Sequence, residues 1–285
     1  MKGDEIMHDV FYFTDIHGVR PLFNAIMNYC KEQDDEAMII FGGDAIDRGP
    51  DGYRIMKELL DNPKVIYLMG NHEDMFCKAA REIKQLLRFD LDNLTREEVS
   101  GQIYWCRNFD YRYCYIQDSL YNGGLETLTD WVMDGMPMDL IERVEKLPLT
   151  FVYNNVDFCH AGSTYKCFEE VNEHEYNNEE MPEWETEPLL WSRTSIDIGW
   201  EPGRTCIFGH TPTPYLEDYL HGFKFEEDDE ITPVLYQRHP GGWKLDMDTG
   251  AVFTEIAYVL NVLTMKAQGF ENTNNEIKKI KCIQF

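Results

Sequence analysis

The most constraining feature of the sequence is a set of short apolar runs that each stop at a turn. Five such runs lie far apart in the chain, at residues 10–13, 38–41, 65–68, 156–159 and 206–208. Short runs rich in β-branched and aromatic residues that end at a turn are typical of buried strands. In layered α/β proteins, ligands bind at the carboxyl ends of such strands. The residues that follow the five runs are therefore expected to converge on one place.

The residues that follow the runs have side chains that bind metals. In chain order they are Asp15 and His17, Asp44, Asn71, His160, and His210. Each segment alone has an ordinary explanation: a DxH triplet is more often chance than a site, Gly-Asn-His is usually a turn, and a lone histidine is usually a satisfied core residue. All five segments nevertheless occur at predicted strand ends, which makes independent coincidence a poor explanation.

This set of residues has the chemistry of a two-metal site. Two divalent cations about 3.5 to 4 Å apart need a bridging carboxylate and a mixed set of carboxylate and imidazole ligands. Asp44 is the natural bridge, and Asn71 adds a neutral amide that keeps the metals acidic. Mixed oxygen and nitrogen ligands suit Mn²⁺, or an iron and zinc pair, better than Mg²⁺ or Ca²⁺. We expect two divalent metal ions, and Mn²⁺ is the preferred candidate.

Four further residues in or near the motifs have roles that such metals require. Arg48 and Arg193 are candidate phosphate ligands, because a guanidinium presents paired donors to phosphoryl oxygens; a surface arginine is an equally good reading of Arg193 from its local sequence. His72 is placed to donate a proton to a leaving oxygen, and Asp47 to hold its imidazole. The alternative for Asp47 is an aspartate that caps a turn.

The charge of the chain limits its partners. The net charge of −26 argues against nucleic acid, because phosphate backbones require an excess of Lys and Arg. Much of the acid lies in the stretches 169–187 and 217–230. These stretches are either solvated loops or a rim that selects basic peptides. We expect a phosphorylated protein, peptide or small molecule as the partner.

Length and composition favour one domain. A chain of 285 residues without a Pro-, Gly- or Ser-rich linker is expected to form a single domain over residues 1–285. No membrane span and no signal pattern at residues 1–5 is visible, so a cytoplasmic protein is expected. The eight cysteines form no CxxC pair, which favours reduced thiols over disulfides or a zinc site.

The order of predicted elements indicates an α/β fold. Strand and helix alternate as βαβαβ in the first 70 residues, and a helical insert follows at about 75–147. Strands return at 149–153, 156–159, 205–208, 243–247 and 251–258. This mixture fits an α/β sandwich, with a two-layer β-sheet core and flanking helices. The segment 266–285 is predicted to be a polar tail that frays.

The motifs TDIHG, GDAIDRGP, GNHE, HAG and GHTP resemble the calcineurin-like metallophosphoesterase superfamily. Within it they resemble the PPP-type serine/threonine protein phosphatases of bacteria and bacteriophages, over residues 11 to about 258. The resemblance implies a four-layer sandwich. It implies one metal held by Asp15, His17 and Asp44, and a second held by Asp44, Asn71, His160 and His210. It also implies phosphate binding by Arg48 and Arg193, and an acid pair of His72 and Asp47.

The predicted reaction is hydrolysis of a phosphomonoester by in-line attack of a metal-bridging hydroxide, without a covalent enzyme intermediate. Proteins that carry phosphoserine or phosphothreonine are the preferred substrate class. A symmetrical dinucleoside polyphosphate hydrolase or another phosphodiesterase is the alternative, because such enzymes use similar motifs. A non-catalytic binding module is a further reading, but every predicted metal and acid position is filled.

Overall fold

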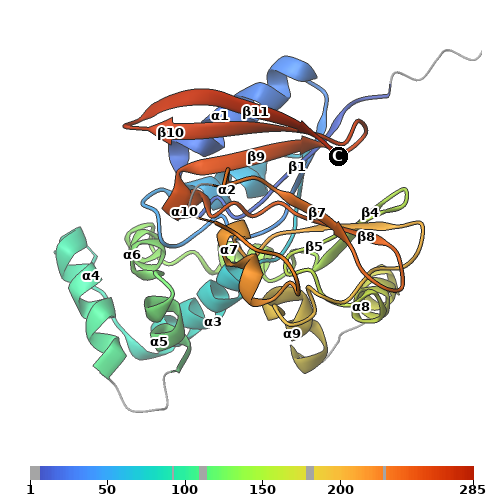
Figure 1. Cartoon of the computed structure of the whole chain (residues 1–285). Helices are drawn as coiled ribbons and strands as arrows, with labels where there is room; N and C mark the ends of the chain where they lie inside the picture. Colours follow the sequence, from blue (N-terminus) through green and yellow to red (C-terminus); the bar gives the residue numbers. More distant parts are fainter. Residues whose placement is uncertain (1–6, 92, 109–113, 178–182, 227–228) are drawn as a thin grey trace, which may run out of the picture.

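Two mixed β-sheets form the centre of the structure (Figure 1). The computed structural model describes residues 7–91, 93–108, 114–177, 183–226 and 229–285. Residues 1–5, where no signal pattern was expected, and parts of both acidic stretches lie outside the described residues. The α/β sandwich predicted from the sequence is confirmed, with sheets of six and five strands.

The first sheet has the order β11-β10-β9-β1-β2-β3. Its strands are β1 (Val10–Phe13), β2 (Met38–Phe41), β3 (Val65–Tyr67), β9 (Ile256–Asn261), β10 (Lys266–Thr273) and β11 (Glu276–Gln284). The parallel strands β1, β2 and β3 are joined by helices α1 (Arg20–Gln33) and α2 (Gly52–Asp61). This is the βαβαβ arrangement predicted from the sequence.

The second sheet has the order β4-β5-β6-β8-β7. Its strands are β4 (Thr150–Tyr153), β5 (Val156–Cys159), β6 (Thr205–Phe208), β7 (Val234–Gln237) and β8 (Trp243–Asp246). Strands β5, β6 and β8 are parallel to one another. The parallel strands of both sheets end at the same region, so the loops after them meet there.

The apolar runs lack a clean alternation because both faces of their strands are covered. In β1, Tyr12 packs against Phe158 and Ile207 of the second sheet, while Phe11 and Phe13 face the opposite side. Helices α1 and α2 cover that side. Helices α8 (Tyr165–Asn177) and α9 (Glu183–Trp191) cover the outer face of the second sheet. The layers are therefore helix, sheet, sheet, helix.

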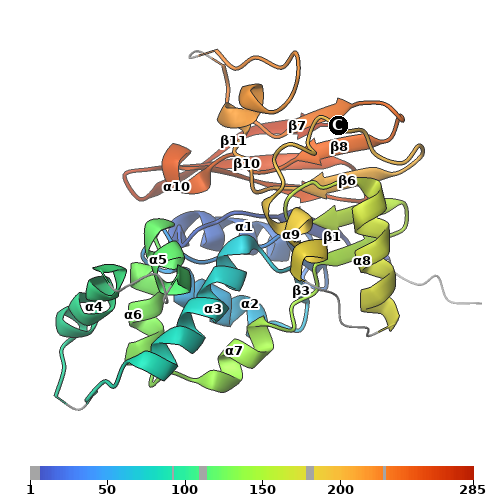
Figure 2. The ribbon, with the colours of Figure 1, turned by 90° about the horizontal axis from the view of Figure 1, so that it is seen from below.

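In the described part of the chain, helices α3 to α7 come after β3 and lie together beside the sheets (Figure 2). They are α3 (Asn71–Leu86), α4 (Arg96–Trp105), α5 (Cys114–Tyr121), α6 (Leu125–Met133) and α7 (Met138–Val144), with a short 3₁₀ turn η1 (Cys106–Asn108). The helical region begins at Asn71, earlier than the expected residue 75, so α3 itself carries Asn71 and His72. Among the described residues, no helix is long and apolar enough to cross a membrane.

The prediction of a strand over residues 251–258 was wrong in its first half. Residues Ala251–Thr254 form a single helical turn, α10, and the strand β9 begins at Ile256. Gly250 before the turn and Glu255 after it both have a left-handed backbone, with φ of 72° and 58°. The β-branched residues of this turn favour a strand, but the tertiary contacts override that propensity.

The prediction of a frayed tail over 266–285 was also wrong. These residues form β10 and β11, which pair as an antiparallel hairpin at the edge of the first sheet. The turn residues Asn274 and Asn275 have φ of 53° and 65°, the left-handed pair that a two-residue hairpin turn requires. The polar composition of β11 reflects an exposed edge strand, where charged side chains face water.

Candidate metal centre

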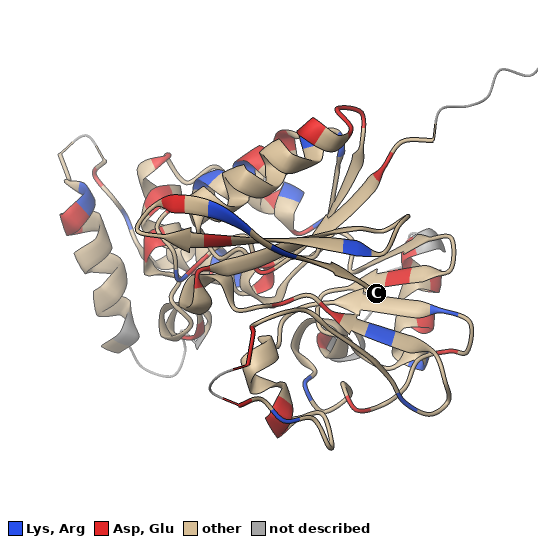
Figure 3. Cartoon of the chain, turned by 45° about the horizontal axis from the view of Figure 1, so that its top comes forward, with Lys and Arg blue, Asp and Glu red and all other residues tan. Residues whose placement is uncertain are grey.

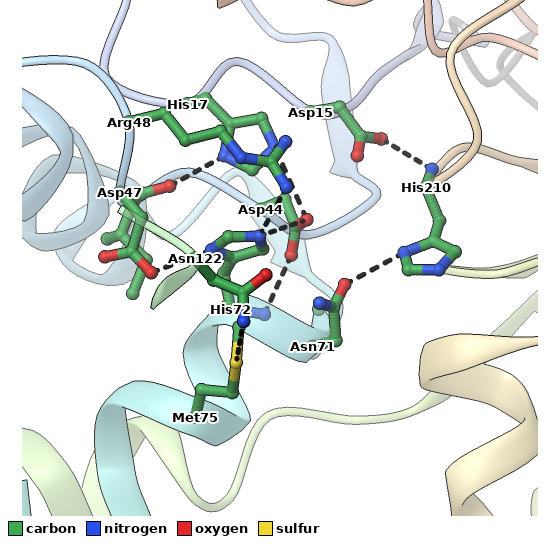
Figure 4. A network of polar contacts seen from close by, with 12 residues as sticks. Asp15, His17, Asp44, Asp47, Arg48, Asn71, His72, Met75, Asn122 and His210 are labelled. Carbon is green, nitrogen blue, oxygen red and sulfur yellow. Dashed lines mark hydrogen bonds and ion pairs between the residues drawn. The ribbon is translucent and has the colours of Figure 1, made fainter. Parts of the chain in front are cut away.

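The predicted metal-binding residues lie around one buried carboxylate, that of Asp44. Figure 4 labels all of them except His160, which also lies beside Asp44. Asp44 follows β2 and is 2% exposed. Its Oδ2 lies 3.5 Å from His17 Nε2, and its Oδ1 lies 3.5 Å from His160 Nε2. The Asp44 carboxylate therefore lies between the imidazoles of His17 and His160.

Six predicted site residues have strained backbones. Their φ values are positive although none is glycine: Asp15 53°, His17 41°, Asp44 60°, Asp47 67°, Arg48 64° and His210 70°. A left-handed backbone is uncommon outside glycine and is stored mainly at functional sites, where the surrounding structure holds it. The strain turns these side chains inward from the strand ends toward a common centre.

Two glycines of the motifs are required by close approach. A Cβ atom on Gly70 would lie 2.2 Å from Asp44 Oδ1, and one on Gly209 would lie 2.0 Å from Asp15 Oδ2. Both distances are far inside van der Waals contact. The glycines before Asn71 and before His210 thus leave room for the carboxylates of the centre.

Backbone carbonyls fix the tautomers of two histidines. His17 Nδ1 donates to Ile46 O at 2.8 Å, and His160 Nδ1 donates to Gly42 O at 2.9 Å. In the neutral ring the other nitrogen, Nε2, then has a free lone pair. A hydrogen bond from the second ring nitrogen to a carbonyl is the usual support of a metal-binding histidine. Both lone pairs point toward Asp44.

Asn71, His160 and His210 form the second half of the centre. Asn71 Oδ1 lies 2.9 Å from His160 Nε2 and 2.9 Å from His210 Nδ1. Because His160 Nε2 has a lone pair, its contact with a carbonyl oxygen sets two acceptors against each other. A divalent cation bound among these atoms relieves that repulsion, so the donor set fits a metal.

The ligand atoms form two groups that share Asp44. The first group contains His17, Asp44 and His72, and the second contains Asp44, His160 and His210. His72 stands in the first group, whereas the family resemblance implies Asp15 as the third ligand there. Asp15 is buried on the other side of Asp44, where its Oδ2 accepts hydrogen bonds from Thr14 Oγ1 at 2.6 Å and His210 N at 3.1 Å.

The buried carboxylates of the centre resist ionisation. Burial raises the pKa of Asp44 well above its ordinary value, and the nearby Asp15 and Glu73 raise it further. Burial also raises the pKa of Asp15. Two carboxylates that both resist ionisation in a dry site are stabilised as anions by bound cations. This electrostatic situation also fits the two expected metals.

His72, Asp47 and Arg48 form one connected group. His72 Nδ1 lies 2.7 Å from Asp47 Oδ2, and both side chains are fully buried. Burial raises the pKa of Asp47 to about 7. The Arg48 guanidinium donates to His72 Nε2 at 2.9 Å and to His17 Nε2 at 2.7 Å. The pairing of His72 with Asp47 that the sequence predicts is present.

The helical region supports this group from the side. Thr127 Oγ1 of α6 accepts from Asp47 N at 3.1 Å, and Gly123 O accepts from Arg48 N at 3.1 Å. Arg193 reaches the centre from the loop after α9, where its Nη2 donates to His210 O at 3.2 Å. All ten residues proposed from the sequence are therefore gathered in one region.

Glu73 has a role that was not predicted from the sequence. Its carboxylate accepts from Asp44 N at 2.8 Å, Ala45 N at 2.9 Å, Gly70 N at 3.1 Å and Tyr67 Oη at 2.7 Å. It therefore fixes the strained loop that presents Asp44. The available signal was a Glu three residues after Gly70 at a helix start, where it bonds the N-cap backbone.

Several solved structures resemble the chain at low identity. One is described as a candidate diadenosine tetraphosphatase, at 14% identity and TM-score 0.47, covering 97% of this chain and 94% of that one. Another is a cold-active protein-tyrosine phosphatase of a psychrophilic Shewanella species, at 13% and 0.47, covering 96% and 81%. A protein serine/threonine phosphatase from Saccharomyces cerevisiae matches at 12% and 0.43, covering 98% and 81%.

No curated protein sequence matches the chain significantly. The family model of the calcineurin-like phosphoesterases matches residues 9–236. That range includes the five strand ends and every residue of the centre described above. The chain therefore belongs to the calcineurin-like phosphoesterase family.

Proposed function

We propose that the chain is a two-metal phosphomonoester hydrolase whose active site is the cluster around Asp44. The observation that supports this most strongly is the convergence of five strand ends on that one buried carboxylate. One cation would be held by Asp15, His17 and Asp44, and the other by Asp44, Asn71, His160 and His210. When bound, the cations would lower the pKa of a water molecule and neutralise charge on the phosphoryl group.

The residues of the chain have separate tasks in this reaction. Arg48 and Arg193 bind the phosphoryl oxygens and offset their charge. His72 would donate a proton from Nε2 to the leaving oxygen when its ring is protonated, with Nδ1 held by Asp47 at 2.7 Å; in the neutral ring Nε2 accepts from Arg48. A buried carboxylate behind an imidazole keeps the ring in one tautomer and stabilises its charged form. Although His72 lies close to His17 and Asp44, we therefore assign it the role of proton donor, and we assign the third ligand of the first metal to Asp15.

The proposed substrate is a phosphoserine or phosphothreonine protein or peptide. The chain has a net charge of −26, and acidic residues occur on many of its helices and loops (Figure 3). A dinucleoside polyphosphate has several negative charges, so this surface repels it more than it repels one phosphate on a neutral or basic peptide. Because of this repulsion, hydrolysis of dinucleoside polyphosphates is our second candidate for the activity of the chain.

Replacing Asp44 tests the metal centre. Asp44→Asn keeps the size of the side chain but removes the charge that both cations share. We expect the variant to lose bound metal and nearly all hydrolysis of para-nitrophenyl phosphate, while its circular dichroism and melting temperature stay close to wild type. Metal content after purification and turnover are the measurements. Wild-type turnover with two bound metals in this variant would refute the assignment.

Replacing His72 separates the proton donor from a metal ligand. A general acid contributes about 10² to 10⁴-fold and matters most for a basic leaving group. His72→Asn should keep its metals and lose much more rate on a phosphoserine peptide than on para-nitrophenyl phosphate. His8→Asn, at the half-exposed His8, is the control and should change neither rate. Equal losses on both substrates with depleted metal would make His72 a ligand instead.

A further inference from the structure

A cavity with aromatic walls opens directly beside the two arginines. It has a volume of about 260 Å³ and is lined by Arg48, Arg193, His210, Pro212, Tyr215, Asp218, Tyr219 and Phe253. A cavity of roughly 150 Å³ is enough to bind benzene. The space is therefore large enough for a phosphoryl group at the arginines together with one aromatic ring.

The aromatic side chains of the cavity are unusually exposed. Phe253 is 61% exposed and Tyr215 is 54% exposed, although large aromatic residues normally lie in the core. The Arg48 guanidinium carbon lies 5.7 Å from the centre of the Phe253 ring, which is within cation–π range. On one face of the cavity, the candidate phosphate ligand Arg48 therefore lies beside the aromatic ring of Phe253.

The two aromatic walls are tied to each other and to the metal centre. Tyr215 lies in the 3₁₀ turn η2 (Thr213–Asp218), which starts three residues after His210. Phe253 lies in α10, close after Asp248. Thr213 N donates to Asp248 O at 2.8 Å, so the backbones of the two walls are directly linked. The walls are consequently held at a fixed position relative to His210.

The charges in the cavity select against polyphosphates. Its cations are Arg48 and Arg193, and both are needed for the phosphoryl group that is hydrolysed. The other charged residue of the lining, Asp218, is acidic and exposed. Further phosphates of a nucleotide would meet this carboxylate without a cation of the lining to offset them. A ring without additional phosphates fits better.

We propose that this cavity binds an aromatic ring that a phosphopeptide carries next to its phosphoryl group, with Phe253 and Tyr215 as the specificity-determining contacts. This inference rests on the proposed hydrolase function and deepens it. The ring comes either from phosphotyrosine itself or from an aromatic residue beside a phosphoserine. In both cases the phosphoryl group lies at the arginines and the ring lies between Phe253 and Tyr215.

A pair of non-hydrolysable probes isolates the contribution of the ring. Phenylphosphonate and methylphosphonate share a phosphoryl head and differ in the ring, so their affinity ratio, measured by calorimetry on the metal-loaded protein, reports ring binding alone. We expect phenylphosphonate to bind about tenfold more tightly, the size of one or two aromatic contacts. Phe253→Ala and Tyr215→Ala should each lower the ratio, and the double variant should bring it close to one, without changing methylphosphonate binding.

Trp105→Ala is the matched control, because Trp105 on α4 is also exposed, at 68%, and lies outside the cavity lining. This variant should keep the wild-type ratio. A wild-type ratio near one, or equal ratios in the wild type and both cavity variants, would overturn the proposal. Because binding is measured without turnover, this result is independent of the activity lost in Asp44→Asn.

Four substrates identify the source of the ring. They are a phosphotyrosine peptide, a phosphoserine peptide with an adjacent Phe, the same peptide with an adjacent Leu, and diadenosine tetraphosphate. A loss of kcat/KM in Phe253→Ala confined to the first peptide makes the phosphorylated ring the occupant, and a loss confined to the second makes the neighbouring residue the occupant. Equal losses on the Phe and Leu peptides without a larger one on phosphotyrosine, or a loss confined to the dinucleotide, would contradict the proposal.

Discussion

At the scale of single residues, the centre depends on groups that bind no metal themselves. Glu73 accepts three backbone N–H bonds and one phenol bond while fully buried, and two of the N–H groups belong to Asp44 and Ala45. Asp44 has a positive φ of 60°, so its loop needs such support. Supporting partners of this kind typically change metal affinity or activity by about 10 to 100-fold.

Replacing Glu73 by Gln should therefore weaken the centre without removing a ligand. The amide nitrogen would face backbone N–H donors, so one or more hydrogen bonds are lost. We expect metal affinity and kcat to fall by about 10 to 100-fold. Glu175→Gln is the control, because Glu175 accepts in the same way from Leu149 N and Thr150 N. Metal titration of both variants should separate them; equal metal affinity would show that Glu73 supports the fold alone.

The candidate metal ligands could be proposed from the sequence because each comes within four residues of the end of a strand. Asp44 comes three residues after the end of β2, and His160 comes immediately after β5. Position along the chain was then enough. The position of Glu73 in a capping box is visible in the sequence, but its contacts with Asp44 and Ala45, 29 and 28 positions earlier, are set by the tertiary structure. Likewise, the approach of His72 rather than Asp15 to His17 is set by tertiary packing.

At the scale of elements, the parallel strands were predictable and the last part of the chain was not. The runs in β1, β2 and β5 are buried on both faces, so their composition alone identified them. The single turn α10 has strand-like residues, and the edge strand β11 has tail-like residues. Both were mistaken because neighbouring elements, not local composition, decide their conformation.

Strand β8 carries a buried lysine that links two loops of the centre. Lys244 is 1% exposed, and its Nζ donates to Gly162 O at 3.0 Å, Ser163 O at 2.9 Å and Ser195 O at 2.9 Å. Gly162 lies two residues after His160, and Ser195 lies two residues after Arg193. Burial lowers the pKa of Lys244 from 10.5 to about 8. The ammonium therefore holds the loops together at a cost in desolvation.

This lowered pKa predicts how stability changes with pH. Below about pH 8 Lys244 is charged in both the folded and the unfolded chain, so its burial cost is constant. Between about pH 8 and 10.5 the unfolded chain binds more protons, so the contribution of Lys244 to stability rises with pH. The free energy of unfolding of wild type, relative to Lys244→Met, should rise by roughly 3 kcal/mol over this window.

Urea unfolding of both proteins at pH 7, 8, 9 and 10 measures this difference. Comparing two variants cancels the buried tyrosines and cysteines, which titrate in the same range. Lys281→Met is the control, because Lys281 is exposed on β11 and pairs with Glu230. The difference between wild type and Lys281→Met should stay flat. A flat difference for Lys244→Met as well would show that the buried amine does not change its charge on folding.

At the scale of the whole molecule, the charge of −26 surrounds a centre that must bind an anion. The two are reconciled by local cations: Arg48 and Arg193 line the cavity beside the centre, together with the metals proposed there. The wider surface still acts over distance, and its field reaches about 10 Å at 0.1 M salt. The repulsion that a substrate meets on its approach to the arginines therefore increases with its total negative charge.

Substrate preference should consequently depend on salt. At low ionic strength we expect kcat/KM for a basic phosphoserine peptide to exceed that for diadenosine tetraphosphate by roughly tenfold or more, because repulsion slows the approach of the more highly charged dinucleotide. Added salt screens this repulsion. The ratio of the two kcat/KM values should therefore fall steadily as the salt concentration is raised from about 0.02 to about 0.5 M. A phosphopeptide with no net charge is the control and should change least.

If the dinucleotide were the better substrate at every ionic strength, the dinucleotide hydrolase would replace the phosphoprotein phosphatase, because distance-dependent repulsion would then not decide the substrate. The metal centre would be untouched by that result, since it is tested by Asp44→Asn alone.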